Sequence, residues 1–301
     1  MQREANTLYA VDVLAPRTLE EALRLKAERP DAVPIQGGTD VMVDLNFDRN
    51  RPDVILDLGG VAELREWSEA TGEIRLGAGV TYARIITELS ERLPGLALAS
   101  RTVGSPQIRN RGTVGGNLGA ASPAGDAHPP LLASGATVEL ASTEGSRRVP
   151  IDDFFVGPKA NAMRPDELIV AVHVPAAAGR EQFSKIGTRN AMVIAAASFA
   201  VSVDPLRRRV GTGIGSAGPT PLRAAEAERF LEGVLNEREA WEAGTPLDDA
   251  TLARFGELVA SAAQPIDDVR ATRAYRVHAL SVMARRTLTW CRESATSNRR
   301  S

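Results

Sequence analysis

The first 60 residues carry short apolar runs separated by polar segments and turns. Residues 33–35 and 54–58 are each apolar enough to predict a short buried strand. Thr18-Leu19-Glu20-Glu21 predicts the start of a helix, with Ala22 and Leu23 facing the core and Pro30 ending it. The pattern therefore predicts a small lobe of strands with one or two helices, preceded by a loose arm over residues 1–10.

From residue 61 to residue 177 the pattern of polar and apolar residues is different. Residues 73–78 alternate between polar and apolar, which is typical of a half-buried strand, and Ser142-Thr143-Glu144-Gly145 predicts a tight turn between two strands. The expected elements are helices over 81–89, with Ile85 and Leu89 inward, and 96–103, a hairpin from 136–140 and 147–151, and a strand over 168–174. Residues 176–179 are small and unpatterned, and they predict a linker.

Beyond the linker, strands are expected over residues 182–188, 193–203 and 208–215, and together they predict an antiparallel sheet. Helical patterns follow over 223–235, 251–263 and 271–290, the second capped by Asp248 or Asp249. In the last helix the pattern points five residues inward: Tyr275, Ala279, Val282, Met283 and Arg286. Residues 293–301 are polar and predict a flexible tail.

Composition places the chain among ordinary globular proteins, with 43% hydrophobic and 25% charged residues. The net charge of -2 provides no basic field, which argues against a nucleic-acid partner. No apolar run approaches the roughly 18 residues of a membrane span. A cytoplasmic location is the default expectation.

The chain has one cysteine, Cys291, so an intrachain disulfide, an iron–sulfur cluster and a structural zinc site are all excluded. A helix thiol near the C-terminus is favoured over a nucleophile. The three histidines, His128, His173 and His278, lack the spacing of metal ligands. We therefore expect no metal site in this chain.

Candidate chemistry is concentrated between residues 111 and 126, where five of sixteen residues are glycine. Glycine adopts φ > 0 at no steric cost, and successive main-chain N–H groups in such a turn can form an anion-binding concavity. Asp126 is placed to cap a helix that has Pro129 and Pro130 in its first turn and Gly135 as its stop. The stretch predicts either a cradle for a phosphate-bearing cofactor or a plain glycine-rich surface loop.

A second glycine loop favours the cradle. Residues 33–41 combine an apolar run, Gly37, Gly38 and the hydroxyl of Thr39. Two such loops could hold a diphosphate from both sides. Neither loop matches the G-x-G-x-x-G fingerprint of dinucleotide-binding folds, and no Lys-Ser or Lys-Thr follows the glycines as in a P-loop.

Several motifs now occur together and in order between about Leu14 and about Arg286. They are Gly37-Gly38-Thr39-Asp40, Ser105-Pro106-Gln107-Ile108-Arg109-Asn110, Thr113-Val114-Gly115-Gly116-Asn117-Leu118, Ser122-Pro123-Ala124-Gly125-Asp126, Asp166-Glu167-Leu168-Ile169 and Phe183-Ser184-Lys185-Ile186-Gly187-Thr188-Arg189. With these motifs the chain resembles the FAD-binding medium subunit of molybdenum hydroxylases, the xanthine dehydrogenase and carbon monoxide dehydrogenase family.

The resemblance implies an α+β fold. A two-lobed PCMH-type FAD-binding domain is expected over residues 1–177, with lobe 1 over about 1–60 and lobe 2 over about 61–177. A C-terminal flavoprotein domain of a three-stranded antiparallel sheet with three helices is expected over residues 180–292, followed by the tail.

The resemblance also implies the cofactor, FAD, held between the two lobes with its ring end near the C-terminal domain. The two glycine loops would wrap the diphosphate and ribityl chain, Asp126 would accept bonds from sugar hydroxyls, and Lys185 would face the flavin. The cofactor-binding residues implied are Pro34, Ile35, Gln36, Gly37, Gly38, Thr39, Asp40, Val41, Val103, Thr113, Gly115, Gly116, Asn117, Ser122, Asp126, Ile169 and Lys185.

Some roles stay open at this point. Thr39 and Asp126 each have helix capping as the alternative role, and Val103 and Ile169 have ordinary core packing. Lys185 is one of only three lysines among 36 cationic residues, which favours a specific role over a solvated surface position. Arg109 and Arg111 face a phosphate, a partner or water. Gln36 departs from the family pattern, which usually has a small residue there.

The implied function is that of an electron-transfer subunit. Substrate would be oxidised on a large molybdopterin subunit, and electrons would pass through a small [2Fe-2S] subunit to this FAD and on to NAD⁺, a quinone or another acceptor. The assembly expected is a dimer of heterotrimers, and no catalytic acid or base is evident in this chain. The alternatives are a self-sufficient FAD oxidoreductase of the vanillyl-alcohol-oxidase-like superfamily and a flavin-free assembly scaffold.

Overall fold

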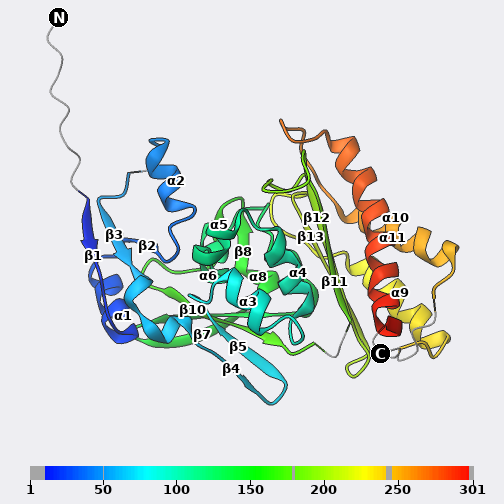
Figure 1. Cartoon of the computed structure of the whole chain (residues 1–301), viewed down its shortest axis with the longest axis horizontal. Helices are drawn as coiled ribbons and strands as arrows, with labels where there is room; N and C mark the ends of the chain where they lie inside the picture. The colour runs from blue at the N-terminus through cyan, green and yellow to red at the C-terminus, as the bar shows by residue number, and fades with distance from the viewer. Residues whose placement is uncertain (1–10, 50, 178–179, 242–245, 298–301) are drawn as a thin grey trace, which may run out of the picture.

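Three packed units follow one another along the long axis of the molecule (Figure 1). A computed structural model describes residues 11–49, 51–177, 180–241 and 246–297. The predicted arm over residues 1–10 and the centre of the predicted linker, residues 178–179, lie outside the described residues.

The first unit is a three-stranded parallel sheet of order β1-β3-β2 with α1 packed on it. The predicted helix start is confirmed, because the Thr18 side chain accepts a hydrogen bond from the Glu21 main-chain N–H at 3.2 Å. The elements are β1 (Asp12–Leu14), α1 (Leu19–Glu28), β2 (Val33–Ile35), α2 (Val41–Asn46) and β3 (Val54–Asp57), followed by the 3-10 turns η1 (Leu58–Gly60) and η2 (Ala62–Arg65).

The second unit is built on a five-stranded antiparallel sheet of order β4-β5-β10-β6-β7, and the predicted hairpin is its β6–β7 pair. Its strands are β4 (Trp67–Ala70), β5 (Glu73–Gly77), β6 (Thr137–Ser142), β7 (Gly145–Pro150) and β10 (Leu168–Pro175). The helices and short elements are α3 (Tyr82–Glu88), α4 (Pro94–Thr102), α5 (Pro106–Arg111), α6 (Val114–Ala120), α7 (His128–Ser134), α8 (Ile151–Phe154), β8 (Phe155–Gly157) and β9 (Ala160–Asn161).

Strand β10 contributes side chains to the hydrophobic cores of both the first and the second unit. Val172 and Val174 pack into the core of the second unit, whereas Leu168 and Val170 pack against the first. Both faces of the strand are therefore covered. Its sequence is apolar except for the buried His173 for this reason, instead of alternating as a strand with one solvent-exposed face does.

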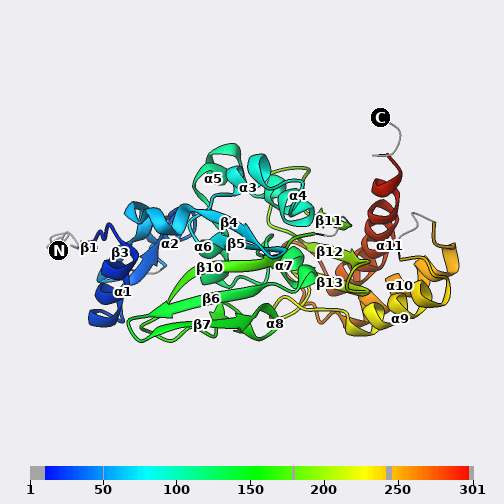
Figure 2. The same ribbon diagram turned by 90° about the horizontal axis from the view of Figure 1, so that it is seen from below.

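The third unit is an antiparallel sheet of order β11-β12-β13 with three helices on its outer face (Figures 1 and 2). Its elements are β11 (Glu181–Ile186), β12 (Ala197–Asp204), β13 (Arg209–Gly215), α9 (Ala225–Glu237), α10 (Asp249–Ala262) and α11 (Arg273–Ser297). The fold class expected from the sequence is thus confirmed. Asp248 is the helix cap, accepting from Thr251 N–H at 2.7 Å.

The inner face of this sheet meets helices α4 and α7 of the second unit, where Ala99, Phe183 and Ala200 share one apolar cluster. Glycines in β13 bring the α7 backbone unusually close. A Cβ on Gly211 would lie 1.9 Å from the carbonyl oxygen of Ala133, and one on Gly213 would lie 2.0 Å from that of Pro129. This interface therefore excludes side chains at both positions.

Two predictions for the last helix are wrong. Tyr275 and Arg286, predicted to face inward, are exposed, whereas Arg276 is buried and only 1% exposed. The hydrophobic pattern assigned the wrong face of the helix to the core, because the charged residue Arg276 occupies an inward position. The helix also continues to Ser297 and so includes residues 293–297, which were expected in the tail, because no glycine or proline there ends it.

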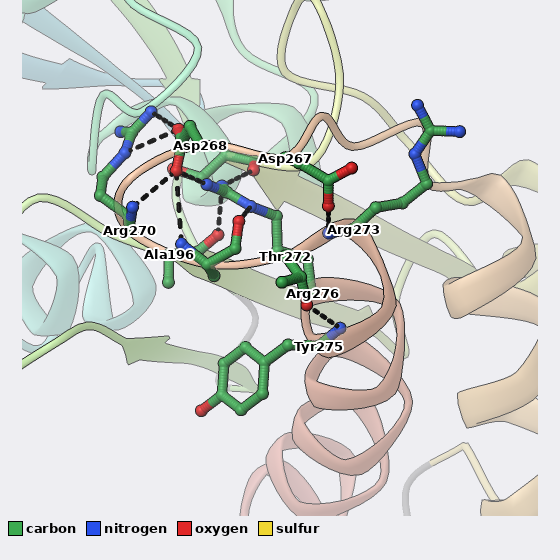
Figure 3. A network of polar contacts seen from close by, with 10 residues as sticks. Ala196, Asp267, Asp268, Arg270, Thr272, Arg273, Tyr275 and Arg276 are labelled. Carbon is green, nitrogen blue, oxygen red and sulfur yellow. Dashed lines mark hydrogen bonds and ion pairs between the residues drawn. The ribbon is translucent and has the colours of Figure 1, made fainter.

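Arg276 is the centre of a polar network that joins α11 to the sheet (Figure 3). Its guanidinium donates to the carbonyl oxygens of Ala196 at 2.7 Å and Ser216 at 2.6 Å, and it pairs with Asp268 at 2.5 Å. Asp268 is held in turn by Arg270, and this pairing lowers the pKa of the Asp268 carboxyl. The buried charge is therefore fully hydrogen-bonded, which is the condition for tolerating it in a core.

Among the described residues, no helix is long and apolar enough to cross a membrane.

Replacing Arg276 should destabilise the C-terminal domain strongly. Arg276→Met removes the guanidinium donor from the carbonyl oxygens of Ala196 and Ser216 and leaves Asp268 paired with Arg270 alone, and we expect a loss of about 3 kcal/mol in the free energy of unfolding. The matched control is Arg254→Met, which removes an exposed pair with Glu257 and should change that free energy by less than about 1 kcal/mol. Urea unfolding measures both. Equal stability of the two variants would contradict the role assigned to the network.

Candidate functional site

The two glycine loops predicted from the sequence touch each other at the boundary between the first two units. A Cβ on Gly37 would lie 2.0 Å from the carbonyl oxygen of Arg111, so only glycine allows this approach. Next to this contact, Tyr82 N–H donates to Gly112 O at 3.0 Å, and Thr81 and Thr113 form an isolated β-bridge. The loops are thereby held as one unit.

The first loop presents a run of unused main-chain donors. The N–H groups of Gly37, Gly38, Thr39, Asp40 and Val41 have no hydrogen-bond acceptor within the described part of the chain; the next one, Met42 N–H, donates to Gly38 O. Gly38 has φ of 76°, a backbone conformation suited to glycine. Successive free N–H groups of this kind attract an anion. The side chain of Asp40, at the start of α2, makes no capping bond.

The second loop differs from its prediction. Gly115 and Gly116 do not lie in a turn with positive φ; they belong to helix α6, which Thr113 caps by accepting from Gly116 N–H at 3.0 Å. Gly115 N–H donates to Ala78 O, so these donors are already used within the protein. These two glycines are important because they have no side chain: Gly115 allows close packing, and Gly116 leaves space next to the helix. A Cβ on Gly115 would lie 2.6 Å from Ala78, whereas one on Gly116 would meet only the Thr113 hydroxyl.

Asp126 does not cap helix α7, contrary to one predicted role. The N-cap position is Ala127, which makes no side-chain capping bond, while Gly135 ends the helix with φ of 70° as predicted. The Asp126 carboxylate instead pairs with Lys185 Nζ at 2.6 Å, and Lys185 also donates to Thr102 O at 3.2 Å. The pair therefore links the second unit to strand β11.

This ion pair is almost closed off from solvent, with side-chain exposures of 7% for Lys185 and 11% for Asp126. Burial raises the pKa of the Asp126 carboxyl to about 6, and the neighbouring Lys185 ammonium opposes that rise. Lys185 is thus neither solvated nor on the surface. The alternative of a surface lysine is wrong, although its relation to a flavin stays a prediction.

Several buried polar atoms at this junction lack a partner within the described chain. They are Gln36 Oε1, Tyr82 Oη, Asp126 Oδ1 and His128 Nδ1. A buried polar atom without a hydrogen bond costs about 1–3 kcal/mol, so a cluster of them points to a ligand. The sequence analysis did not identify Tyr82 as a candidate. The one feature of the sequence that indicates its position is that it follows Thr81, the cap of helix α3.

The remaining predicted residues divide into two groups. Ile169 lies beside α6, where a Cβ on Gly119 would be 3.8 Å from its side chain, and Val103 ends α4 directly after Thr102. Asn117 and Ser122 serve local structure, since Asn117 Oδ1 accepts from Ala127 N–H and Ser122 Oγ accepts from Ala124 N–H.

Arg109 has a structural role. Its Nη1 atom donates to the carbonyl oxygens of Val103 at 3.1 Å and Gly104 at 3.0 Å, and a further contact of the guanidinium with a phosphate or a partner stays a prediction. Arg111 is exposed, and its main chain provides the contact with Gly37.

The environments of the three histidines and the cysteine are those of packing or surface residues. Burial lowers the pKa of His128 to about 4, so its ring is neutral, and Nε2–H donates to Asn117 O at 3.2 Å. His173 bridges Glu73 and Glu139 at 2.9 and 2.7 Å, and His278 is exposed on α11. Cys291 is buried, which raises the pKa of its thiol to about 12. Within the ranges described, no group of three or more His, Cys, Asp or Glu is placed to hold a metal ion.

Together these features fit a ligand that carries both an anion and hydroxyl groups. Free main-chain donors suit a diphosphate, the space beside Gly116 admits a chain close to the backbone, and the unpaired carboxylate oxygen of Asp126 requires a donor such as a hydroxyl. FAD has all of these groups.

Comparison with known proteins agrees. A family model of the FAD binding domain in molybdopterin dehydrogenase matches residues 9–177, and a model of the CO dehydrogenase flavoprotein C-terminal domain matches residues 182–291. The putative xanthine dehydrogenase FAD-binding subunit of Escherichia coli K12 is 32% identical over 285 residues, covering 90% of this chain and 92% of that protein. The nicotinate dehydrogenase FAD-subunit of Eubacterium barkeri is 34% identical over 249 residues, covering 78% and 84%.

Solved structures give the same result. Quinoline 2-oxidoreductase from Pseudomonas putida 86 contains a chain with a TM-score of 0.84 and 27% identity, covering 95% of this chain and 98% of that one. Reconstituted CO dehydrogenase from Oligotropha carboxidovorans contains another, also at 0.84 and 27%, covering 94% and 98%. With both family models matched in order over nearly the whole length, the chain belongs to the FAD-binding subunits of the molybdopterin dehydrogenases.

Proposed function

We propose that this chain binds FAD at the junction of its two N-terminal lobes and transfers electrons from a partner subunit to an external acceptor. The observation that carries the proposal is the run of five unused N–H groups in the first loop, in a chain whose relatives are FAD subunits of dehydrogenase complexes. FAD, when bound, supplies the ability to take up and release electrons. The part of this protein is to bind the cofactor, orient it and set the charge around it.

The first loop would hold the diphosphate with main-chain donors from Gly37 to Val41, which bring no side chain into the space that the phosphates need. Thr39 would add a hydroxyl donor. On the other side, Gly116 is exposed on helix α6 next to the capping residue Thr113, and Ile169 supplies apolar contact beside this helix. Pro34, Ile35 and Gln36 lead from strand β2 into this loop.

Lys185, Asp126 and Val103 would surround the end of the cofactor nearest the C-terminal domain. An ammonium near the flavin favours the negative charge that reduction adds, and the adjacent carboxylate moderates that effect. The ion pair would therefore tune the reduction potential through two opposed charges.

The partners expected are a small [2Fe-2S] subunit and a large molybdopterin subunit, in a dimer of heterotrimers. Two relatives support a multi-subunit assembly, because they are the medium subunit of nicotine 6-hydroxylase and the medium chain of glyceraldehyde dehydrogenase. The single cysteine excludes an iron–sulfur cluster in this chain. We place the boundary between the FAD-binding domain and the C-terminal domain at residues 177–180.

Gly116→Val should abolish flavin binding without unfolding the chain. The residue is helical, and its Cβ meets only the Thr113 hydroxyl, so the added side chain would project into the space assigned to the cofactor. Gly233→Val is the matched control, because Gly233 lies in helix α9 and a Cβ there meets nothing within 4 Å. The ratio of flavin to protein absorbance measures occupancy. Full occupancy in Gly116→Val would show that the site is misplaced.

Lys185→Met and Asp126→Asn should shift the flavin midpoint potential in opposite directions. Loss of the ammonium should lower the potential, and loss of the carboxylate should raise it, because the first removes a positive and the second a negative charge near the flavin. A dye-equilibration titration of each loaded variant measures the shift. Potentials unchanged in both variants would place the ion pair away from the flavin.

The relay role predicts dependence on partners. The FAD-loaded chain alone should oxidise no purine, aldehyde, N-heterocycle or carbon monoxide, whereas addition of the small and large subunits should allow flavin reduction on substrate addition. Stopped-flow absorbance of the flavin, with and without those subunits, measures this. Substrate-driven bleaching in the isolated chain would favour a self-sufficient oxidoreductase, and a purified chain that takes up no FAD would favour an assembly scaffold.

A further inference from the structure

Tyr82 is a buried residue whose hydroxyl has no use in the protein fold. The residue is only 3% exposed, and Oη has neither a hydrogen-bond partner in the described chain nor contact with solvent. Its ring packs beside Gly112, where a Cβ would lie 3.3 Å from Tyr82 Cδ2, and its main-chain N–H donates to Gly112 O. The side chain is therefore held firmly at the contact between the two glycine loops.

Acidic groups of both loops contribute to the electrostatic environment of the Tyr82 hydroxyl. Burial raises the pKa of Tyr82 well above its ordinary value, and the carboxylates of Asp126 and Asp40 raise it further. Tyr82 thus stays protonated at any physiological pH and keeps a proton to donate.

Two unpaired acceptors accompany this donor. Asp126 uses Oδ2 for Lys185, while Oδ1 has no partner within the described residues. Gln36 Oε1 is also unpaired, and its amide lies beside Gly79, three residues before Tyr82. The ligand that satisfies all three must both accept and donate.

The need for a group that both accepts and donates decides which part of a dinucleotide can bind here. A phosphate at neutral pH only accepts, so it could pair with Tyr82 but would leave Asp126 Oδ1 unpaired and would be repelled by it. A sugar hydroxyl accepts one hydrogen bond and donates another. Adjacent hydroxyls of a polyol can therefore accept from Tyr82 and donate to Asp126.

We infer that Tyr82 is a positioning residue for the cofactor, and that its hydroxyl binds a hydroxyl of the ribityl chain of FAD jointly with Asp126 Oδ1. The inference rests on the proposed FAD site. Both atoms are closed off from solvent, so the side chains around them must move when the dinucleotide enters.

Tyr82→Phe tests this with two readouts of opposite sign. The substitution deletes an unsatisfied polar group, so the flavin-free chain should melt at the same temperature or higher, whereas a purely structural hydroxyl would make it melt lower. FAD should bind about tenfold more weakly to the variant. Ser261→Ala, which removes an exposed hydroxyl on α10, is the control and should change neither value. An unchanged FAD affinity in Tyr82→Phe would overturn the inference.

FAD analogues that lack single hydroxyls identify the contact. Analogues with one deoxy position in the ribityl chain and flavin 2′-deoxyadenosine dinucleotide are titrated against the wild-type chain and Tyr82→Phe. The ribityl analogue that lacks the contacted hydroxyl should bind both proteins equally, whereas flavin 2′-deoxyadenosine dinucleotide should keep the tenfold difference. A tenfold difference that persists with every analogue would contradict the contact. Failure of the wild-type chain to bind FAD would overturn the proposed function as well, whereas wild-type binding with an unaffected Tyr82→Phe would overturn this inference alone.

Discussion

The packing of Gly37 against the Arg111 carbonyl is the contact on which the rest of the site depends. With 2.0 Å between that oxygen and a hypothetical Cβ, any other residue would push the two loops apart. The contact places the free N–H groups of the first loop beside the helix that begins after Thr113. The hydrogen bond from Tyr82 N–H to Gly112 O and the Thr81–Thr113 bridge then fix the third segment, residues 77–82, against the same point.

A second constraint acts between the domains. Helix α7 packs with its backbone directly on β13, and close to it the buried Asp126–Lys185 pair joins the FAD-binding domain to strand β11. A buried ion pair contributes little net stability, because desolvation offsets much of the attraction. Its burial together with the unpaired atoms of Tyr82 and Asp126 agrees with the role proposed for these residues at the cofactor.

Local signals in the sequence predicted much of the fold. The cap at Thr18, the cap at Asp248 and the strand over residues 168–174 each follow from chemistry within a few residues, and the structure confirms them. The position of the two glycine loops was predicted as well, but not the reason for the second. Gly115 and Gly116 are helical, and a glycine run by itself does not tell a turn from a helix that must pack closely.

The failures come from partners distant in the sequence. Asp126 follows the pattern of a helix cap, and its true partner, Lys185, is 59 residues away. Arg276 occupies an inward position of α11 because Asp268 and two main-chain carbonyls neutralise it, and a hydrophobic pattern assigns such a residue to the outer face. The hydroxyl of Tyr82 is informative only because its neighbours leave it unpaired, which no sequence pattern contains.

Amide hydrogen exchange over the first loop tests the central claim most directly. The N–H groups of residues 37–41 lack acceptors in the described structure and should exchange quickly in the flavin-free chain. Addition of FAD should slow their exchange, while the amides of helix α9, far from the site in Figure 1, should be unaffected. Binding of FAD that leaves the exchange of residues 37–41 unchanged and protects another segment would contradict the account.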